Sequence, residues 1–253
     1  MNDRPLILVT NDDGVDAKGI KQLIEVMRFF GDVVVVAPDR PMSGKSASIT
    51  VDQPLRIKKL KEEEGYTKYQ CNGTPVDCVK LAFNQILDRH PDFVVSGINH
   101  GANSSISLMY SGTMGAAIEG CLHGIPSIGF SLCDYDPDAD FAKVKIYVAR
   151  IFQQVAENGL PPFVCLNVNF PQGEIRGIKV ARQTAGKWVE EFDKRTDPHG
   201  HDYFWLTGHL KNFEPEKDDT DLNAIENQFV SIVPVNIDVT CYQTIETIKK
   251  WKF

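Results

Sequence analysis

The sequence lacks several features that mark particular classes of protein. It has no run of about 18 consecutive apolar residues, so we expect no membrane-spanning segment and no membrane partner. Its first residues show neither a charged region nor a long apolar core, which argues against a secretion signal. None of its 6 cysteines forms a CxxC pair. We therefore expect free thiols in a cytoplasmic protein, in preference to a zinc site or disulfides.

Three phosphate- and acyl-handling motifs are also missing, namely GxGxxG, GxxxxGK[ST] and GxSxG. The chain has 27 Lys and Arg residues against 34 Asp and Glu residues, giving a formal net charge of −7. Such a surface gains nothing from counterion release, so we expect no long nucleic acid as a partner. A single small anion can still bind where a helix terminus or a metal ion reverses the local field.

Short apolar runs alternate with segments of helical periodicity through the first 170 residues. Buried strands that alternate with helices are typical of a parallel sheet covered on both faces. We therefore expect an α/β fold with a Rossmann-like, mostly parallel sheet and helices on both faces. Strands are expected at 6–9, 33–36, 93–95, 125–132 and 163–170, with helices at 20–30 and 75–87, from about 112 and from about 141.

Two regions interrupt this alternation. Residues 46–70 have strand-like pieces at 48–51 and 55–57 without a helical stripe, which predicts a β-rich insertion. Residues 186–253 are polar and irregular, and we expect them to form a C-terminal extension of the core (residues 1–185), not an independent domain. The extension has strand-like pieces at 203–206 and 229–232, which should recruit a partner chain, and an acidic run at 214–221, expected to be a solvated loop.

Polar clusters directly follow three of the expected strands, at 11–14, 38–44 and 96–99. In open parallel sheets, ligands bind beyond the carboxyl ends of the strands, so these loops should meet. Asp12 and Asp13 repel each other unless they share a cation. Ser43 and Asn99 would complete an oxygen-only shell of the kind that Mg²⁺ or Mn²⁺ prefers. Taken singly, these residues also fit turns and helix caps.

A second cluster fits an anion. Ser111, Gly112 and Thr113 stand at an expected helix start, where free N–H groups bind phosphate, and Asn103 could donate its amide to the same group. Tight helix–sheet packing explains the small residues equally well. We expect bulk at Gly112 to weaken phosphate binding and to leave metal affinity nearly unchanged. His100 could protonate a leaving group, although a loop histidine is more often simply solvated.

At these residues the sequence closely resembles the survival-protein family of 5′- and 3′-nucleotidases, often called SurE. The resemblance implies metal ligands at Asp12, Asp13, Ser43 and Asn99, of which Asp12, Asp13 and Asn99 are catalytic. It implies one divalent ion per subunit, a C-terminal extension swapped in a homodimer or homotetramer, and phosphate contacts at Asn103, Ser111, Gly112 and Thr113. The matching segments, in order, are 7–14, 37–50, 72–79, 95–103, 111–120, 166–171, 219–221 and 238–240.

One departure is visible, because His199-Gly200-His201 stands where the family usually has Arg-Gly-Arg. Arginine is a fixed cation and histidine is not, so a phosphate-holding role of that loop is in doubt.

The implied reaction is metal-dependent hydrolysis of nucleoside monophosphates, at the 5′ and also the 3′ position. Either water or Asp12 could be the nucleophile. The alternatives are a broader phosphomonoesterase or exopolyphosphatase, and a nucleotide-binding regulator without turnover. A receiver-like signalling module needs an Asp after its central strand and a Lys after a later one. The corresponding strand ends here, at 38–41 and 96–99, fit that pattern poorly.

Overall fold

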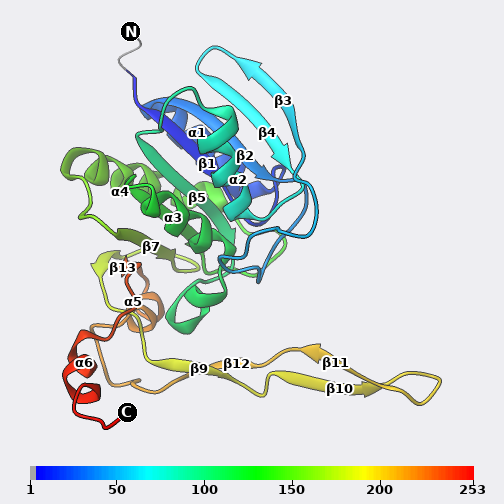
Figure 1. The fold of residues 1–253 in the computed structure, drawn as a ribbon, viewed down its shortest axis with the longest axis vertical. Coiled ribbons are helices and arrows are strands. Elements are labelled where there is room, and N and C mark those ends of the chain that lie inside the picture. Colours follow the sequence, from blue (N-terminus) through cyan, green and yellow to red (C-terminus); the bar gives the residue numbers. More distant parts are fainter. Residues whose placement is uncertain (1–3) are drawn as a thin grey trace.

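The computed structural model describes residues 4–253 and centres on one nine-stranded sheet (Figure 1). The strands lie in the order β3-β4-β2-β1-β5-β6-β7-β13-β8. Every pairing from β4 to β7 is parallel, whereas β3 and β13 each run antiparallel to a neighbour. The strands of the parallel part are β1 (Leu6–Thr10), β2 (Asp32–Pro38), β4 (Tyr66–Cys71), β5 (Phe93–His100), β6 (Ser127–Leu132) and β7 (Val164–Phe170).

Helices cover both faces of this sheet. On one face, α1 (Lys18–Phe30) and α4 (Lys145–Asn158) pack over Ile7, Val35 and Val95. On the other, α2 (Pro75–Leu81) and α3 (Gly112–Leu122) lie together over Leu8, Val36 and Val94. The alternate burial of adjacent strand residues under the two layers explains the continuous apolar runs of β1 and β2. The expected Rossmann-like α/β fold is confirmed. Short helical turns complete it: η1 (Ala82–Ile86), η2 (Ser105–Tyr110) and η3 (Phe141–Val144).

The region predicted as a β-rich insertion differs from expectation in where its strands lie. β3 (Ile57–Glu63) and β4 form an antiparallel hairpin that extends the main sheet through β2. Residues 48–51, expected to be strand-like, form no strand. Their polar groups instead bond to the capped start of α2. Thr50 donates to the Asp77 carboxylate through its N–H (3.1 Å) and hydroxyl (2.6 Å), and the Thr74 hydroxyl donates to Ser48 O (2.7 Å).

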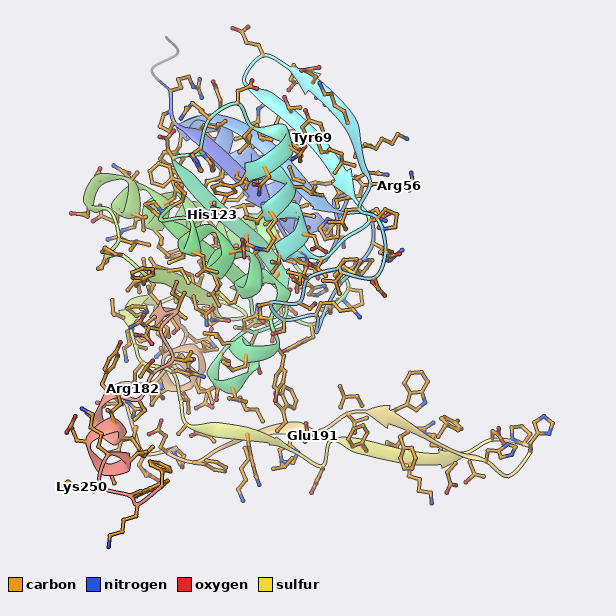
Figure 2. The ribbon with its side chains drawn as sticks, in the orientation of Figure 1. Arg56, Tyr69, His123, Arg182, Glu191 and Lys250 are labelled. Carbon is orange, nitrogen blue, oxygen red and sulfur yellow. The ribbon has the colours of Figure 1, made fainter. Side chains whose placement is uncertain are left out.

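A long two-stranded arm leaves the body after residue 185 (Figure 1). Its root pairs β9 (Gly186–Val189) with β12 (His209–Asn212), and its outer part pairs β10 (Phe192–Thr196) with β11 (Asp202–Leu206). Side chains stand out from both sides of the outer arm (Figure 2). Phe192, Phe204, Trp205 and Leu206 are all exposed. The arm therefore carries apolar surface that its own chain leaves uncovered.

Beyond the arm the chain returns to the body. β13 (Phe229–Asn236) inserts between β7 and β8 (Gly177–Val180), after the short helix α5 (Asp221–Glu226). The expected extension at 186–253 thus contributes a strand to the central sheet. The part lying outside it is the arm, together with the terminal segment that bears α6 (Tyr242–Ile248), none of whose residues is buried.

The acidic run at 214–221 is not simply a solvated loop. Arg182 binds Glu214 through Nη1 (2.6 Å) and Asp219 through Nε (2.8 Å). Asp221 is 1% exposed and accepts hydrogen bonds from the N–H groups of Ser105 (2.7 Å) and Thr184 (3.0 Å). The run contains charges with fixed partners, which sequence composition cannot separate from solvated ones.

Two expectations concern the chain as a whole. All six cysteines are free, and four of them are buried. Within residues 4–253, none of the helices has the length and apolar character needed to cross a bilayer.

Candidate active site

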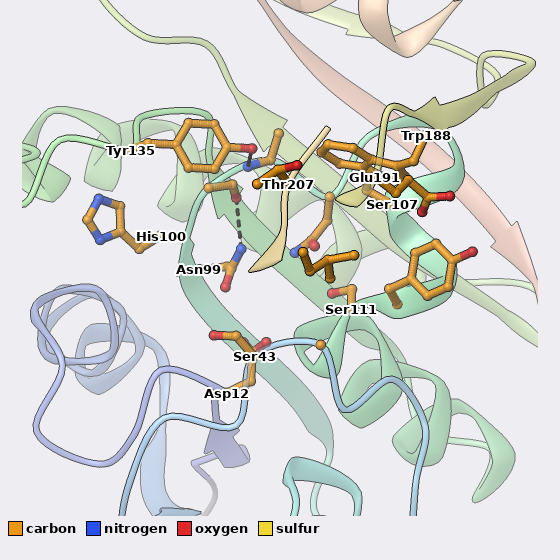
Figure 3. Close-up of a pocket in the computed structure, with 16 residues that line it drawn as sticks. Asp12, Ser43, Asn99, His100, Ser107, Ser111, Tyr135, Trp188, Glu191 and Thr207 are labelled. Atoms are coloured by element: carbon orange, nitrogen blue, oxygen red, sulfur yellow. Dashed lines mark hydrogen bonds between the residues drawn. The ribbon is translucent and has the colours of Figure 1, made fainter. Parts of the chain in front are cut away.

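A cavity of about 560 Å³ lies at the carboxyl ends of the parallel strands. The body contributes a polar side, with Asp12, Ser43, Asn99, Asn103 and Ser111 among its lining residues. Asp12 follows β1, Ser43 follows β2, and Asn99 ends β5, so the parallel sheet brings these three to one edge, as the sequence predicts. Figure 3 shows Asp12 and Ser43 together, with Asn99 facing them.

Asp12 is the most buried carboxylate of the site, at 3% exposed. Burial raises its pKa, while hydrogen bonds from the Thr113 hydroxyl and from the N–H groups of Thr113 and Gly112 act in the opposite direction. The hydroxyl bond, from Thr113 Oγ1 to Asp12 Oδ1, is 2.5 Å long. A buried carboxylate held at the start of α3 is an anionic group whose orientation is fixed by its own chain.

Asp13, the next residue in the chain, is not among the residues that line the cavity. Its Oδ2 accepts a hydrogen bond from the His100 N–H (3.0 Å), which ties the end of β1 to the end of β5. Burial, followed by the negative charge of Asp12, raises the pKa of Asp13 to about 6. The mutual repulsion that the sequence implies is therefore present, and a shared cation would remove it.

Asn99 owes its direction to a break in the β5–β6 ladder. The register shifts between Ser96 and Asn99, a β-bulge of the kind that re-aims side chains beside active sites. The Asn99 amide donates through Nδ2 to Gly101 O (2.8 Å), which leaves its oxygen turned toward Asp12 and Ser43 (Figure 3). Ser43 stands in a turn that is fixed by the bond from Met42 N to Asp12 O (2.7 Å).

The donors at this end of the cavity fit a hard divalent cation. The Asp12 carboxylate, the Ser43 hydroxyl and the Asn99 amide oxygen line this end, with Asp13 next to Asp12 in the chain, and the Asn99 amide is already oriented with its oxygen outward. Within residues 4–253 no three His, Cys, Asp or Glu side chains group as a metal site, so any cation here depends on the neutral oxygens of Ser43 and Asn99 as well. This composition suits Mg²⁺ or Mn²⁺ better than zinc.

The start of α3 differs from the sequence-based picture of an open anion site. Its first N–H groups, at Gly112 and Thr113, lie close enough to Asp12 to lower the pKa of that carboxylate, and Met114 N bonds to Ser111 Oγ (3.0 Å). The Thr113 hydroxyl is likewise committed to Asp12. Of the four predicted phosphate-contacting residues, Asn103 and Ser111 line the cavity, whereas Gly112 and Thr113 contact Asp12.

Gly112 allows this contact because it has no side chain. A Cβ at this position would lie 2.8 Å from Asp12 Cβ and 3.0 Å from Asp12 Oδ2. A larger residue would displace the carboxylate itself, so the structure favours a loss of metal affinity as well, in contrast to the expectation from sequence.

Asn103 is held by a buried chain of polar side chains under the cavity. Its N–H donates to Asn169 Oδ1 and its Nδ2 donates to Ser131 Oγ, both at 2.8 Å, while its carbonyl accepts from Asn167 Nδ2, also at 2.8 Å. The position of Asn103 is thus set by β6 and β7, whose polar residues Ser131, Asn167 and Asn169 are fully buried.

Sequence reasoning missed the opposite wall of the cavity. It is lined by four residues of the arm, Trp188, Glu191, Leu206 and Thr207. Figure 3 shows Trp188, Glu191 and Thr207 across the space from Asp12 and Ser43. Nothing in the local pattern marks them, because their place depends on how the arm leaves the body. His100 also lines the cavity, but its ring turns away from Asp12 and packs edge-on against Phe141 at 5.6 Å between centroids, which does not support it as a proton donor (Figure 3).

The fold and site together define a class: Rossmann-like α/β proteins whose strand-end loops enclose an acidic, oxygen-rich cavity for a small ligand. Residues 7–190 match the model of the family described as "Survival protein SurE". The chain therefore belongs to the SurE family, as its motifs indicate.

Similar proteins match over nearly the whole chain. A protein of Phocaeicola vulgatus named 5′-nucleotidase SurE is 50% identical over 250 residues, covering 98% of this chain and 97% of that protein. One of the same name from Flavobacterium johnsoniae is 52% identical, covering 99% and 98%. The crystal structure of the SurE protein of Aquifex aeolicus superposes with a TM-score of 0.84 at 38% identity, covering 97% of this chain and 98% of that one.

Proposed function

We propose that this protein is a phosphoric monoester hydrolase that converts nucleoside monophosphates to nucleoside and phosphate. The observation that carries the proposal is the two-sided cavity, with buried oxygen ligands at one end and room for an organic group at the other. Its volume of about 560 Å³ exceeds the space that inorganic phosphate needs and falls within the usual range for small-molecule sites. The full-length similarity to proteins named 5′-nucleotidase supports the same reaction.

Asp12, Asp13, Ser43 and Asn99 would hold one Mg²⁺ or Mn²⁺ ion per subunit. When bound, such a cation offsets negative charge on the transferring phosphoryl group. Asp12 combines burial with a fixed orientation and Asn99 presents an oriented amide oxygen, so little reorganisation accompanies binding. Asp13 contributes charge and links β1 to β5.

Asn103 and Ser111 would contact the phosphate oxygens. The Ser111 hydroxyl accepts from Met114 N and keeps its own proton to donate, and Asn103 Nδ2 has a second hydrogen beyond the one given to Ser131. Gly112 and Thr113 act one step away by fixing Asp12. In the reaction the P–O bond to the nucleoside breaks, a new P–O bond forms to the attacking oxygen, and the leaving nucleoside oxygen takes up a proton.

The cavity favours monophosphates over polyphosphates. Among residues 4–253, its 16 lining residues include no Lys or Arg, and Glu191 adds a negative charge on the far wall. A second or third phosphate group would bring further negative charge with no side-chain cation to offset it. A nucleoside part, which is uncharged, fits that wall better than a polyphosphate chain.

We also propose that the arm and the terminal segment are the contacts of a homodimer or homotetramer, in which they extend onto a partner chain. The exposed Phe192, Phe204, Trp205 and Tyr242 are the surface that such a contact would bury. The free thiols fit a reducing cytoplasm.

Phosphate release from a panel of substrates tests the proposal. We expect turnover of nucleoside 5′-monophosphates in Mg²⁺ or Mn²⁺, less of 3′-monophosphates, little of nucleoside triphosphates or polyphosphate, and none after chelation and dialysis. Equal rates on polyphosphate and monophosphates would instead support the broader exopolyphosphatase. Full activity after chelation would contradict the proposed requirement for a metal ion.

A further inference from the structure

The pairing of the two strands of the arm is interrupted where they pass the cavity. The β9–β12 ladder ends at the pair Val189–His209, and the β10–β11 ladder begins at Phe192–Leu206. Between them lie two residues on each strand that belong to neither ladder, where Thr207 N donates to Glu191 O (2.8 Å). Glu190 there has the left-handed backbone angle φ 54°, and Gly208, opposite, has φ 96°. One continuous hairpin is thus broken once, beside the site.

A regular strand would place certain of these side chains on opposite sides of the arm. The break brings them to the same side. Trp188 and Glu191 are three positions apart, and Leu206 and Thr207 are adjacent, yet all four line the cavity. In an unbroken strand, alternate residues face opposite ways, so neither pair could share a face. Breaks and bulges of this kind re-aim side chains next to active sites.

The root of the arm is fixed to the same part of the body as the phosphate end. Asp221 accepts hydrogen bonds from Thr184 N, two residues before β9, and from Ser105 N, two residues after Asn103. The Ser105 hydroxyl also donates to Thr184 O (2.9 Å). The distance between the arm wall and the phosphate-contacting residues is therefore set within one chain.

The chemistry of this wall differs from that of the body side. Trp188 is half-buried, and among residues 4–253 its indole N–H has no acceptor. Leu206 adds apolar surface, while Glu191 offers a carboxylate and Thr207 a hydroxyl. A flat aromatic ring stacks on an indole, and a carboxylate accepts hydrogen bonds from vicinal hydroxyls. Both features match a nucleoside.

We infer that the arm on either side of this break is the nucleoside-binding wall of the active site, with Trp188 stacking on the base and Glu191 accepting a hydrogen bond from the ribose. This inference rests on the proposed function and assigns specificity to residues outside the strand-end loops. The arm then has two parts with separate tasks: its root recognises the substrate, and its outer strands carry the exposed apolar surface.

The first test compares substrates that share the phosphate and the sugar. Trp188→Ala should raise KM for adenosine 5′-monophosphate about tenfold, because base stacking on an aromatic residue is worth roughly that much. The KM for ribose 5-phosphate, which has no base, should not change. Trp188→Phe should recover most of the loss. Trp205→Ala removes the same side chain from the outer arm, which lies off the cavity, and should leave both KM values at the parent level.

Glu191→Gln tests the ribose contact. It should raise KM for adenosine 5′-monophosphate several-fold and leave the 2′-deoxy substrate almost unaffected. Equal effects on both substrates would overturn this part of the inference.

Binding of adenosine alone gives a readout that does not depend on turnover. The chain has 3 tryptophans, and we expect adenosine to quench the fluorescence of the parent and of Trp205→Phe but not of Trp188→Phe. Suppose that the parent hydrolyses both substrates, that Trp188→Ala has the parental KM for each, and that quenching persists in Trp188→Phe. The assignment of the nucleoside-binding wall is then wrong, and the nucleotidase proposal stands. If the parent hydrolyses neither substrate, the nucleotidase proposal fails and the inference fails with it.

Discussion

The two walls of the cavity are built in opposite ways. On the body side, Asp12, Asn99 and Asn103 are each fixed by hydrogen bonds to neighbouring strands or helices of the same chain. On the arm side, half-buried Trp188 stands one residue before the ladder ends, and the strands beyond the break leave Phe204 and Trp205 exposed. The proposed catalytic geometry, which must be preorganised, lies at the edge of the sheet. A binding surface that tolerates some adjustment lies on a protruding element.

Asp12→Asn should have the largest effect, because it acts on the most fixed residue of the body side. The substitution removes the buried charge and turns an amide toward donors that now bind a carboxylate, so we expect turnover to fall about 10³-fold or more. Phosphate release and circular dichroism measure activity and fold together. Asp88→Asn, at an exposed position, is the control and should keep parental turnover. A folded Asp12→Asn protein with near-parental turnover would show that the body side is not the reaction centre.

Gly112→Val should come next, with a loss of about 10²-fold in turnover and weaker metal binding. The new Cβ would lie 2.8 Å from Asp12 Cβ, so the carboxylate must move. Gly177→Val is the matched control, since a Cβ there meets only Phe229, at 3.4 Å. If Gly112→Val lost phosphate affinity but bound Mn²⁺ as tightly as the parent, Gly112 would belong to the phosphate site in the way the sequence alone implied.

The residues of these two predictions differ in how much of their position could be predicted from the sequence. The sequence pattern predicts that Asp12, Ser43 and Asn99 lie together, because buried parallel strands end at one edge of the sheet whatever the details of their loops. It could not show that Thr113 and Gly112 turn toward Asp12, since that depends on the angle at which α3 starts. Nor could it place Trp188, whose position depends on how the arm leaves the body far along the chain. The antiparallel return of β13 was visible only as an apolar run, with no signal for its partner.

Asp221→Asn should test the hydrogen-bonded connection between the arm wall and the body side of the cavity. The buried carboxylate accepts bonds from Ser105, Thr184 and Leu222, and an amide would face some of these donors with its own NH₂ group. We expect a loss of about 3 kcal/mol in the free energy of unfolding, measured by urea titration. Asp218→Asn, in the same acidic run but exposed, should change it by less than about 0.5 kcal/mol. Equal stability of the two variants would mean that Asp221 does not anchor the arm.

Shortening the arm should have the smallest effect on chemistry and should separate its two tasks. Replacing residues 192–206 by a tight turn removes β10 and β11 but keeps Trp188, Glu191 and Thr207. We expect light scattering to show a smaller assembly than that of the parent, with KM for nucleoside monophosphates changed by less than about tenfold, because Leu206 is the only lining residue lost. A monomeric parent, or a shortened protein with the parental mass, would contradict the oligomer contact.

Calorimetric titration with Mn²⁺ tests the central claim most directly, since the whole site is organised around Asp12. After chelation and dialysis, the parent should bind one Mn²⁺ per chain. Ser43→Ala should bind it more weakly, and Asp12→Asn should show no saturable binding in the same concentration range. Parental Mn²⁺ affinity in a folded Asp12→Asn protein would contradict the assignment of the strand-end oxygens as the metal site.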